Sequence, residues 1–344
     1  SYKKIEENLK NLKKDSSLAL IVPNTYSYID QQLISQIKKK YPNVNVFCLD
    51  YTISDNKLTA IKELTGNYGY QQNEFKSAKF VVSFNHDFLG LESSELRSGF
   101  HFIKNKNNFK FVSYSDSLTT SDSKADSIIN SSIKEQEHTI NYIAKSIARK
   151  LPNSSIKTQL KRLTYNKNLI DRTKAHKITQ MLNRYRGNAI ITAGDRHSVN
   201  TQKIIYLLNL ALSNLNKTIF IKSFASKQFN ITSYSNYLDT VSNLKDKLKN
   251  GSIKSVISLG VDLTRHINDL SQIINENTFI TYLSKYRDNM SDLAEATISQ
   301  THFLEDWGLL LGKEGDLLIQ QPLINPLYNG VSSSQVLLSI LNQS

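Results

Sequence analysis

The stretch KFVVSFNHDF, from Lys79 to Phe88, recurs later in the chain as KSVISLGVDL, from Lys254 to Leu263. Each copy is a short apolar run that ends in a polar turn, with an Asp four residues after its Ser. Short β-branched runs bounded by turn residues predict buried strands. A strand-and-turn unit that occurs twice predicts two similar halves. We therefore expect a pseudo-duplicated protein built on parallel sheets.

Strands and helices alternate around both copies. We expect strands at 18–22, 44–49, 79–84, 109–114, 188–195, 218–222, 254–259 and 278–283. We expect helices at 3–14, around 29–37, and at about 55–65, 93–105, 134–151, 168–185, 199–213, 237–249 and 265–275. Such alternation is typical of the α/β class, with helices on both faces of a parallel sheet. The predicted fold is two Rossmann-like, doubly wound halves.

These elements suggest a division of the 344 residues into domains of ordinary size. We assign residues 1–152 to a first α/β domain. Residues 153–186 form a polar helical connection. Residues 187–344 form a second α/β domain with a C-terminal extension.

The polar turns after the strands are where a ligand site is expected, because open parallel sheets bind ligands beyond the carboxyl ends of their strands. The candidate residues at these ends are Asn24, Asp87, Gly194, Asp195, Gly260 and Asp262. None belongs to a Gly-x-Gly-x-x-Gly phosphate-binding turn. An Asp after a strand also serves as a helix N-cap or in an Asx turn. We favour that structural role and expect no cofactor-binding residue; if a vestigial cleft is present, these six residues are the candidates for it.

Other candidate chemistry is weaker. His302, Glu305 and Asp306 share a helical spacing, but a zinc helix typically supplies two histidines. The pairs His86 with Asp87 and Asp195 with His197 lack an accompanying nucleophile motif. We therefore expect no catalytic residue and no metal site, and a scaffold rather than an enzyme.

Composition limits the partners. The net charge is +13, but Lys and Arg are dispersed and their densest runs fall at the ends of expected helices, so we expect a solvated surface and no nucleic-acid partner. No apolar stretch reaches the ~18 residues of a membrane helix, so no direct membrane span is expected. The single cysteine, Cys48, excludes an internal disulfide and a cysteine-ligated iron–sulfur cluster. No signal peptide stands at Ser1, so an export signal would have been removed or lie elsewhere.

Two segments of the tail carry a resemblance to a known family. THFLEDWG, at 301–308, and LIQQPLINPLY, at 318–328, resemble the end of the molybdopterin-binding fold in the molybdopterin-oxidoreductase-like subunit of bacterial alternative complex III. Residues 75–90, ending in DFLG, resemble a strand and turn of that family. SLTT at 117–120 and KAD at 124–126 resemble a further motif. The segments occur in the family's order along most of the chain.

The resemblance implies the two central α/β domains of the molybdopterin oxidoreductase fold, without a cofactor. It implies a structural role in a membrane-associated respiratory complex that oxidises quinol, on the periplasmic side of the bacterial inner membrane. The implied partners are iron–sulfur, multihaem cytochrome and quinol-binding membrane subunits. The chain lacks the cysteine motifs of the family's iron–sulfur half.

Two alternatives stay open. The chain could be a catalytic oxidoreductase domain that binds a molybdopterin dinucleotide and works with a separate iron–sulfur chain. It could also be an unrelated α/β module that binds a small ligand.

Overall fold

The protein divides into two compact units. A computed structural model describes residues 18–23, 27–49, 56–67, 69–92, 96–223, 234–274, 278–311 and 317–342. Unit 1 comprises residues 1–53 and 225–344, and unit 2 comprises residues 54–224. The helix expected at 3–14 lies outside the described residues.

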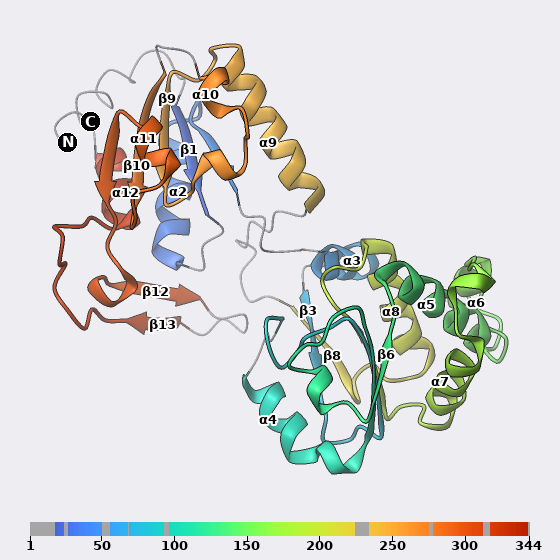
Figure 1. The fold of residues 1–344 in the computed structure, drawn as a ribbon. Helices are drawn as coiled ribbons and strands as arrows, with labels where there is room; N and C mark the ends of the chain where they lie inside the picture. Colours follow the sequence, from blue (N-terminus) through green and yellow to red (C-terminus); the bar gives the residue numbers. More distant parts are fainter. Residues whose placement is uncertain are drawn as a thin grey trace. The chain divides into compact units, whose positions relative to one another are not determined.

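Unit 1 is built on a five-stranded parallel sheet with the order β11-β10-β9-β1-β2 (Figure 1). The strands are β1 (Leu18–Val22), β2 (Asn45–Cys48), β9 (Ser255–Leu259), β10 (Phe279–Ser284) and β11 (Ala296–Ser299). The helices are α2 (Tyr28–Lys40), α9 (Tyr234–Lys249), α10 (Leu270–Ile273), α11 (Asn289–Leu293) and α12 (Ser333–Asn342). A hairpin of β12 (Gly308–Leu311) and β13 (Leu317–Gln320) lies outside the main sheet.

Side chains of β1 alternate between the two faces of this sheet, as the pleat of a strand requires. Leu20 packs with residues of α2 and α12, whereas Ile21 packs with residues of α9 and α10. All five residues of β1 are buried. A central strand covered by helices on both faces is what its continuous apolar run predicts.

Unit 2 is built on a four-stranded parallel sheet with the order β6-β5-β4-β7. Its strands are β4 (Phe80–Phe84), β5 (Lys110–Ser115), β6 (Ser127–Asn130) and β7 (Ala189–Ala193). Its helices are α3 (Asn56–Thr65), α4 (Leu96–Asn105), α5 (Ile133–Ala148), α6 (Ser155–Arg162), α7 (Arg172–Arg184) and α8 (Val199–Ala211). A separate antiparallel pair joins β3 (Gly69–Asn73) to β8 (Ile219–Ser223).

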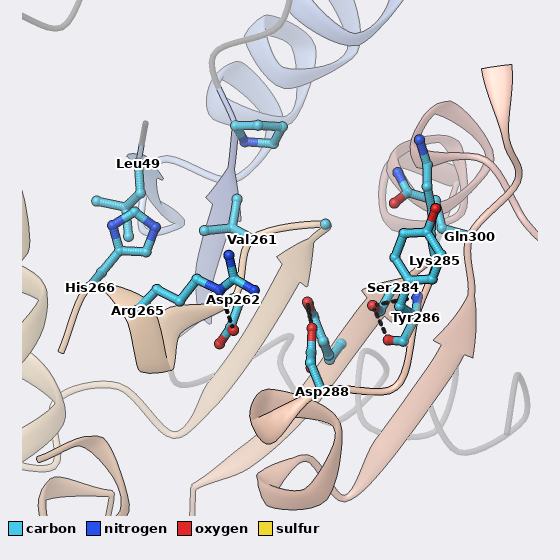
Figure 2. Close-up of a pocket in the computed structure, with 13 residues that line it drawn as sticks. Leu49, Val261, Asp262, Arg265, His266, Ser284, Lys285, Tyr286, Asp288 and Gln300 are labelled. Atoms are coloured by element: carbon cyan, nitrogen blue, oxygen red, sulfur yellow. Dashed lines mark hydrogen bonds and ion pairs between the residues drawn. The ribbon is translucent and has the colours of Figure 1, made fainter. Parts of the chain in front are cut away.

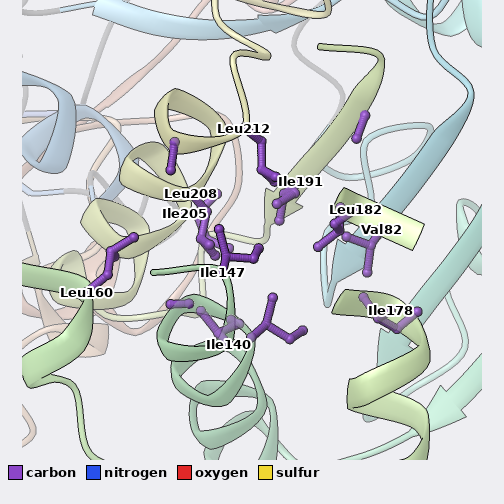
Figure 3. Packing of buried hydrophobic residues seen from close by; sticks show 14 of the residues in the cluster. Val82, Ile140, Ile147, Leu160, Ile178, Leu182, Ile191, Ile205, Leu208 and Leu212 are labelled. Carbon is purple, nitrogen blue, oxygen red and sulfur yellow. The ribbon is translucent and has the colours of Figure 1, made fainter. Parts of the chain in front are cut away.

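The larger core of unit 2 lies between β4, β7 and the helices α5, α7 and α8. Ile147 of α5, Leu182 of α7 and Leu208 of α8 meet Val82 and Ile191 of the sheet (Figure 3). A second cluster, rich in phenylalanine, covers the other face and includes Phe102 of α4 and Ile219 of β8. Unit 2 is therefore also a sheet with a core on each face.

Both units share a strand arrangement around one copy of the repeated phrase. In unit 2, β4 is followed by β5 and β6 on one side and has β7 on the other. In unit 1, β9 is followed by β10 and β11 on one side and has β1 on the other. The strand order reverses beside β4 and beside β9, so each is at a topological switch point. The expected α/β class and pseudo-duplication are confirmed.

The predicted domain boundaries at residues 152 and 187 differ from those of the two units. Strands β1 and β2 pair in the sheet of β9, although we assigned them to the first domain. Strand β7 pairs with β4, although we assigned it to the second. The expected strand 218–222 lies in the antiparallel pair β3–β8 and does not continue a parallel sheet. Alternation along the chain predicts strands but not their hydrogen-bonding partners.

The elements that the sequence did not predict include β3, β6, α6 and α11. These are short, polar elements, such as GYQQN in β3 and SIIN in β6, so they lack the apolar run that marked the other strands. None of the described helices is long and apolar enough to cross a bilayer.

Candidate functional site

The two copies of the repeated phrase fold into the same turn at their strand ends. Ser83 Oγ donates a hydrogen bond to the His86 carbonyl oxygen at 3.4 Å, and Ser258 Oγ donates to the Val261 carbonyl oxygen at 2.6 Å. Both hydroxyls are buried. The Ser of each copy therefore closes the turn that follows its strand.

The residue two positions after that Ser has a positive φ in both copies. Asn85 has φ +50° and Gly260 has φ +76°, a region that Asn and Gly tolerate best. The N–H of Asn85 donates to the Tyr114 carbonyl at the end of β5. The N–H of Gly260 donates to the Leu283 carbonyl near the end of β10 in the same way.

Unit 1 has an open pocket of about 410 Å³ at this turn, beyond the carboxyl ends of its strands (Figure 2). Its volume lies in the range of small-molecule sites. The residues that line it are Pro23, Leu49, Gly260, Val261, Asp262, Arg265, His266, Tyr282, Ser284, Lys285, Tyr286, Asp288 and Gln300. The pocket thus lies at the switch point, where the topology predicts a ligand site.

Two carboxylates of the pocket are engaged by neighbouring groups. Asp262 accepts from the backbone N–H of Thr264 at 3.0 Å and pairs with Arg265 Nε at 3.1 Å. Asp288 accepts from the Tyr282 hydroxyl at 2.8 Å and caps α11 through Ser291. Burial, reinforced by the Asp288 carboxylate, raises the pKa of Tyr282 to about 12. Lys285 adds a second cation to the lining.

The turn of unit 1 does not fit the pyrophosphate of a pterin dinucleotide. The N–H of Gly260 is already bonded to Leu283, so it does not serve as a phosphate donor. The next residue is Val261, whose side chain is buried in the core, where a phosphate-binding turn needs the close backbone approach that glycine allows. The pocket suits a small polar ligand better than a dinucleotide.

At the switch point of unit 2 the turns after β4 and β7 pack directly on each other. The N–H of Gly194 donates to the Phe84 carbonyl at 2.8 Å. A Cβ at Gly194 would collide with the Asn85 carbonyl oxygen. Glycine is needed here for the contact between two backbones, which leaves no gap for a phosphate.

Glu92 fills the space next to this contact. Its Oε1 accepts from the Asp195 N–H at 3.0 Å, and its Oε2 lies 3.7 Å from Lys57 Nζ and 3.5 Å from His86 Nε2. Lys57 also pairs with Asp195 at 3.0 Å. On the other side of its ring, His86 Nδ1 is 2.6 Å from Thr192 Oγ1. A backbone N–H after a strand, which could bind a ligand anion, is here bound by the chain's own carboxylate.

Burial dominates the electrostatics of this cluster. It raises the pKa of the Glu92 carboxyl, an effect opposed by Lys57 and reinforced by Asp195. It holds the pKa of His86 well below its usual range, helped by the positive charge of Lys57. Burial also lowers the pKa of His197 to about 4. Both histidines are therefore neutral at neutral pH.

Asp87 is saturated by hydrogen bonds from its own turn and from Ser121 in the loop after β5. Its Oδ1 accepts from the N–H and hydroxyl of Ser121, at 2.9 and 3.0 Å, and its Oδ2 accepts from the Leu91 N–H at 3.0 Å. Burial would raise the pKa of Asp87, but these hydrogen bonds lower it below its ordinary value. Asp87 therefore orders the loop and has little capacity left for a ribose or a base.

No protein-family model matches the chain, and no curated protein sequence matches it. Solved structures do. The chain resembles acetylene hydratase from Pelobacter acetylenicus, with a TM-score of 0.70 and 13% identity. The match covers 98% of this chain and 57% of that one. It also resembles a chain of the formyltransferase/hydrolase complex from Methylorubrum extorquens, solved with methylofuran. There the TM-score is 0.58 with 9% identity, covering 99% of this chain and 95% of the other.

At such identities the likeness concerns the fold alone. This chain therefore shares an α/β fold with these two structures over nearly its whole length. The chain spans a little over half of the acetylene hydratase chain, so the activity of that enzyme does not transfer to it.

The candidate residues from the sequence fall into two groups. Gly260 and Asp262 line the pocket of unit 1, whereas Asp87, Gly194 and Asp195 surround the filled turn of unit 2. Asn24 lies outside the described residues. Glu92 and Lys57 were not predicted from the sequence, because they contact Asp195 from distant positions and no local motif marks them.

The tail cluster has a structural role. His302 and Glu305 form a capping box around the short helix Phe303–Glu305, in which the His302 N–H donates to Glu305 Oε2 at 2.8 Å. Glu305 Oε1 also accepts from the Leu327 N–H at 3.1 Å. Among the described residues, no group of three or more His, Cys, Asp or Glu is placed to hold a metal ion.

Proposed function

We propose that this chain is a non-catalytic, molybdopterin-oxidoreductase-like module with a structural role in a membrane-associated respiratory complex of the alternative complex III type. The likeness of fold to acetylene hydratase supports the molybdopterin-oxidoreductase-like part of this proposal. The tail, DFLG and SLTT segments, which occur in the order of the alternative complex III subunit, support the role in a respiratory complex by resemblance. The proposed partners are iron–sulfur, multihaem cytochrome and quinol-binding membrane subunits, on the periplasmic side of the inner membrane.

The observation that carries the absence of catalysis is the occupied turn of unit 2. A pterin dinucleotide would need backbone donors at the switch point for its phosphates. In this chain the Asp195 N–H is bound by Glu92, and Gly194 packs against the Asn85 carbonyl. The Glu92 carboxylate belongs to the chain, so it binds this N–H without the entropy loss that a free ligand anion would suffer. A ligand anion would have to displace it. The catalytic alternative is therefore the less favoured one.

Purification of the tagged chain from membranes of its native host tests this proposal. We expect it to co-purify with haem-containing and quinol-binding subunits, and to hold molybdenum and tungsten far below one atom per chain. Stoichiometric metal, or a pterin chromophore in the isolated chain, would overturn the non-catalytic part. Co-purification with no respiratory subunit would overturn the assembly part.

The pocket of unit 1 favours a second candidate function, which is the binding of a small anionic ligand. Lys285 and Arg265, which is paired with Asp262, supply cations at a switch point, and the volume suits a small molecule. Ligand binding to the native state raises its thermal midpoint. Thermal-shift measurements with inorganic pyrophosphate and with nucleoside mono- and diphosphates test it.

A matched pair of variants separates specific from general charge effects in that screen. Arg265→Ala removes a cation from the pocket, whereas Arg287→Ala removes an exposed one that pairs with Asp292 and does not line the pocket. A shift that is lost in Arg265→Ala and kept in Arg287→Ala supports the pocket. Equal shifts in both, or none in the parent protein, count against it.

A further inference from the structure

The β12–β13 hairpin of unit 1 exposes an apolar strand. Leu318 is 58% exposed and Ile319 is 72% exposed, although they follow each other in β13 and so point to opposite faces of the ribbon. Neither face of β13 is therefore covered by the described residues. Exposed apolar edges are rare on monomeric proteins, because they promote pairing with other chains, and β13 is such an edge over its four residues.

One edge of this strand is also open. β12 pairs with β13 in antiparallel register, from Gly308 opposite Gln320 to Leu311 opposite Leu317. On its other side β12 is bridged by Ser27 through Leu310. Within the described part of the chain, no strand pairs with the outer edge of β13. Figure 1 shows β13 as the outer arrow of the hairpin.

The structure around β13 is held in place by hydrogen bonds. Gln320 Nε2 donates to the Phe303 carbonyl, and the Leu323 N–H donates to the Leu304 carbonyl at 2.7 Å. The Leu327 N–H is held by Glu305. These contacts fix the segment after β13, in which Leu323, Leu327 and Tyr328 are 77%, 68% and 81% exposed. The apolar surface is preorganised, which reduces the entropic cost of binding a partner.

The charge pattern identifies the chemistry of that partner. Residues 317–342 contain no Asp, Glu, Lys or Arg, although charged residues make up 21% of the chain. Natural edge strands are usually protected by charged side chains, and β13 has none. A neutral apolar edge does not attract nucleic acid or anionic lipid. Depletion of charge together with exposed Leu and Tyr is typical of the centre of a protein–protein interface.

We propose that the open edge of β13 accepts an extended, uncharged apolar segment of another protein subunit, which adds a strand to the hairpin. Backbone hydrogen bonds along the edge supply affinity, and the side chains of Leu318 and Ile319 supply the apolar contacts on the two faces. The inference rests on the proposed function, because it presumes that the chain is part of an assembly. It adds the place of contact and the kind of segment that is bound.

Site-specific photo-crosslinking in the native host tests the inference. The photoreactive residue benzoylphenylalanine replaces Ile319 in the full chain, and mass spectrometry identifies the peptide that it captures. A matched probe replaces Leu238 of α9, which is 52% exposed in the same unit. We expect the Ile319 probe to capture one uncharged segment of another subunit, and the Leu238 probe to capture no such segment.

A charge variant adds a second readout. Leu318→Lys combined with the Ile319 probe is expected to lower the crosslink yield by roughly tenfold or more, whereas Leu238→Lys leaves it unchanged. Both positions are exposed, so we expect the thermal midpoints of the variants to be unchanged. An unchanged midpoint shows that a variant folds. A crosslink within the same molecule, to a second copy of this chain or to lipid would overturn the inference. So would a crosslink yield that Leu318→Lys does not change.

The two proposals fail separately. If the chain co-purifies with respiratory subunits but the Ile319 probe captures only this chain, the docking inference fails and the proposed function stands. If the probe captures an uncharged segment of a protein outside any quinol-oxidising complex, the docking inference stands and the proposed function fails.

Discussion

The Glu92 carboxylate accepts a hydrogen bond of 3.0 Å from the backbone N–H of Asp195. It comes from the loop after β4 and binds the first residues after β7, so it joins the two sides of a topological switch point. Parallel-sheet proteins commonly use this location for a ligand anion. In unit 2 the protein supplies the anion itself, and the turn becomes part of the folded structure.

Removing this carboxylate should destabilise unit 2. We expect Glu92→Ala to lower the free energy of unfolding by about 2 kcal/mol, because it leaves the Asp195 N–H without its acceptor and removes one of the two carboxylates beside Lys57. The control is Glu63→Ala, which removes an exposed ion pair with Lys203 in the same unit and should cost about 0–1 kcal/mol. Native-state hydrogen exchange of β4 and β7 amides measures both. Equal losses would contradict a special role for Glu92.

The same variant should create an anion site. With Glu92 removed, inorganic phosphate is expected to raise the thermal midpoint of Glu92→Ala more than that of the parent protein, since the Asp195 N–H then lacks its acceptor and the Lys57 cation, still paired with Asp195, lies beside it. Sodium chloride at matched ionic strength controls for general screening. A shift of the same size in both proteins would show that the carboxylate does not occupy an anion position.

Stability of unit 2 should fall on acidification. The folded pKa of His197 is about 4, below the ~6.5 of an unfolded histidine, so the unfolded state binds more protons between these values. This contribution is present above pH 6.5 and is lost as the pH falls, by about 2 kcal/mol between pH 7 and 5. His86 acts in the same direction. Glu92, whose folded pKa is raised, opposes it in the acidic part of the window.

Denaturant titrations between pH 5 and 8 measure this slope. His197→Gln keeps a polar side chain near Gln136, the partner of His197 Nε2, and removes the titrating group. We expect the variant to show a shallower pH dependence than the parent. Identical slopes would exclude His197 as the cause.

Gly194 should not tolerate a side chain. A Cβ there would meet the Asn85 backbone, which cannot move without disturbing both turns. We expect Gly194→Ala to cost about 2–4 kcal/mol. Gly99→Ala is the control. Gly99 lies inside helix α4, and a Cβ there would make only an ordinary contact with Leu89, so this substitution should stabilise the protein by about 0.5–1 kcal/mol. Thermal unfolding of both proteins compares them, and similar midpoints would refute the steric argument.

In the pocket of unit 1, Tyr282→Phe should cost about 1–2 kcal/mol because it removes the donor to the half-buried Asp288 carboxylate. Tyr286→Phe is the control on the pocket rim, where the side chain is 78% exposed, and should change stability by less than about 0.5 kcal/mol. Hydrogen exchange of β9 and β10 amides reports on this unit. A loss in Tyr286→Phe as large as in Tyr282→Phe would contradict the assignment.

The same tyrosine predicts an alkaline effect. Because the folded pKa of Tyr282 is about 12, above the ~10 of an unfolded tyrosine, its contribution is present below pH 10 and lost as the pH rises towards 12. Tyr282→Phe should therefore lose stability less steeply in that range than the parent protein. Parallel alkaline titrations of the two proteins check this.

The sequence predicted the repeated strand and its turn from local chemistry. β4 and β9 are buried apolar runs, and the Ser hydroxyl of each copy bonds to the carbonyl three residues further along its own turn. Such contacts depend on neighbours in the chain, so they could be read from the two copies alone. The α/β class followed from the same alternation of short apolar runs and helices.

The sequence did not predict which strands pair or what fills the turns. β1 lies beside β9, and β7 beside β4, because their apolar faces pack under shared helices, and that choice depends on residues far apart in the chain. The pairing of Glu92 with Lys57 and Asp195 has the same origin. Local periodicity therefore determined the elements, the class of fold and the duplicated turn. Tertiary packing alone decided the two units, the open pocket of unit 1 and the occupied switch point of unit 2, because these depend on contacts between segments that no local pattern connects.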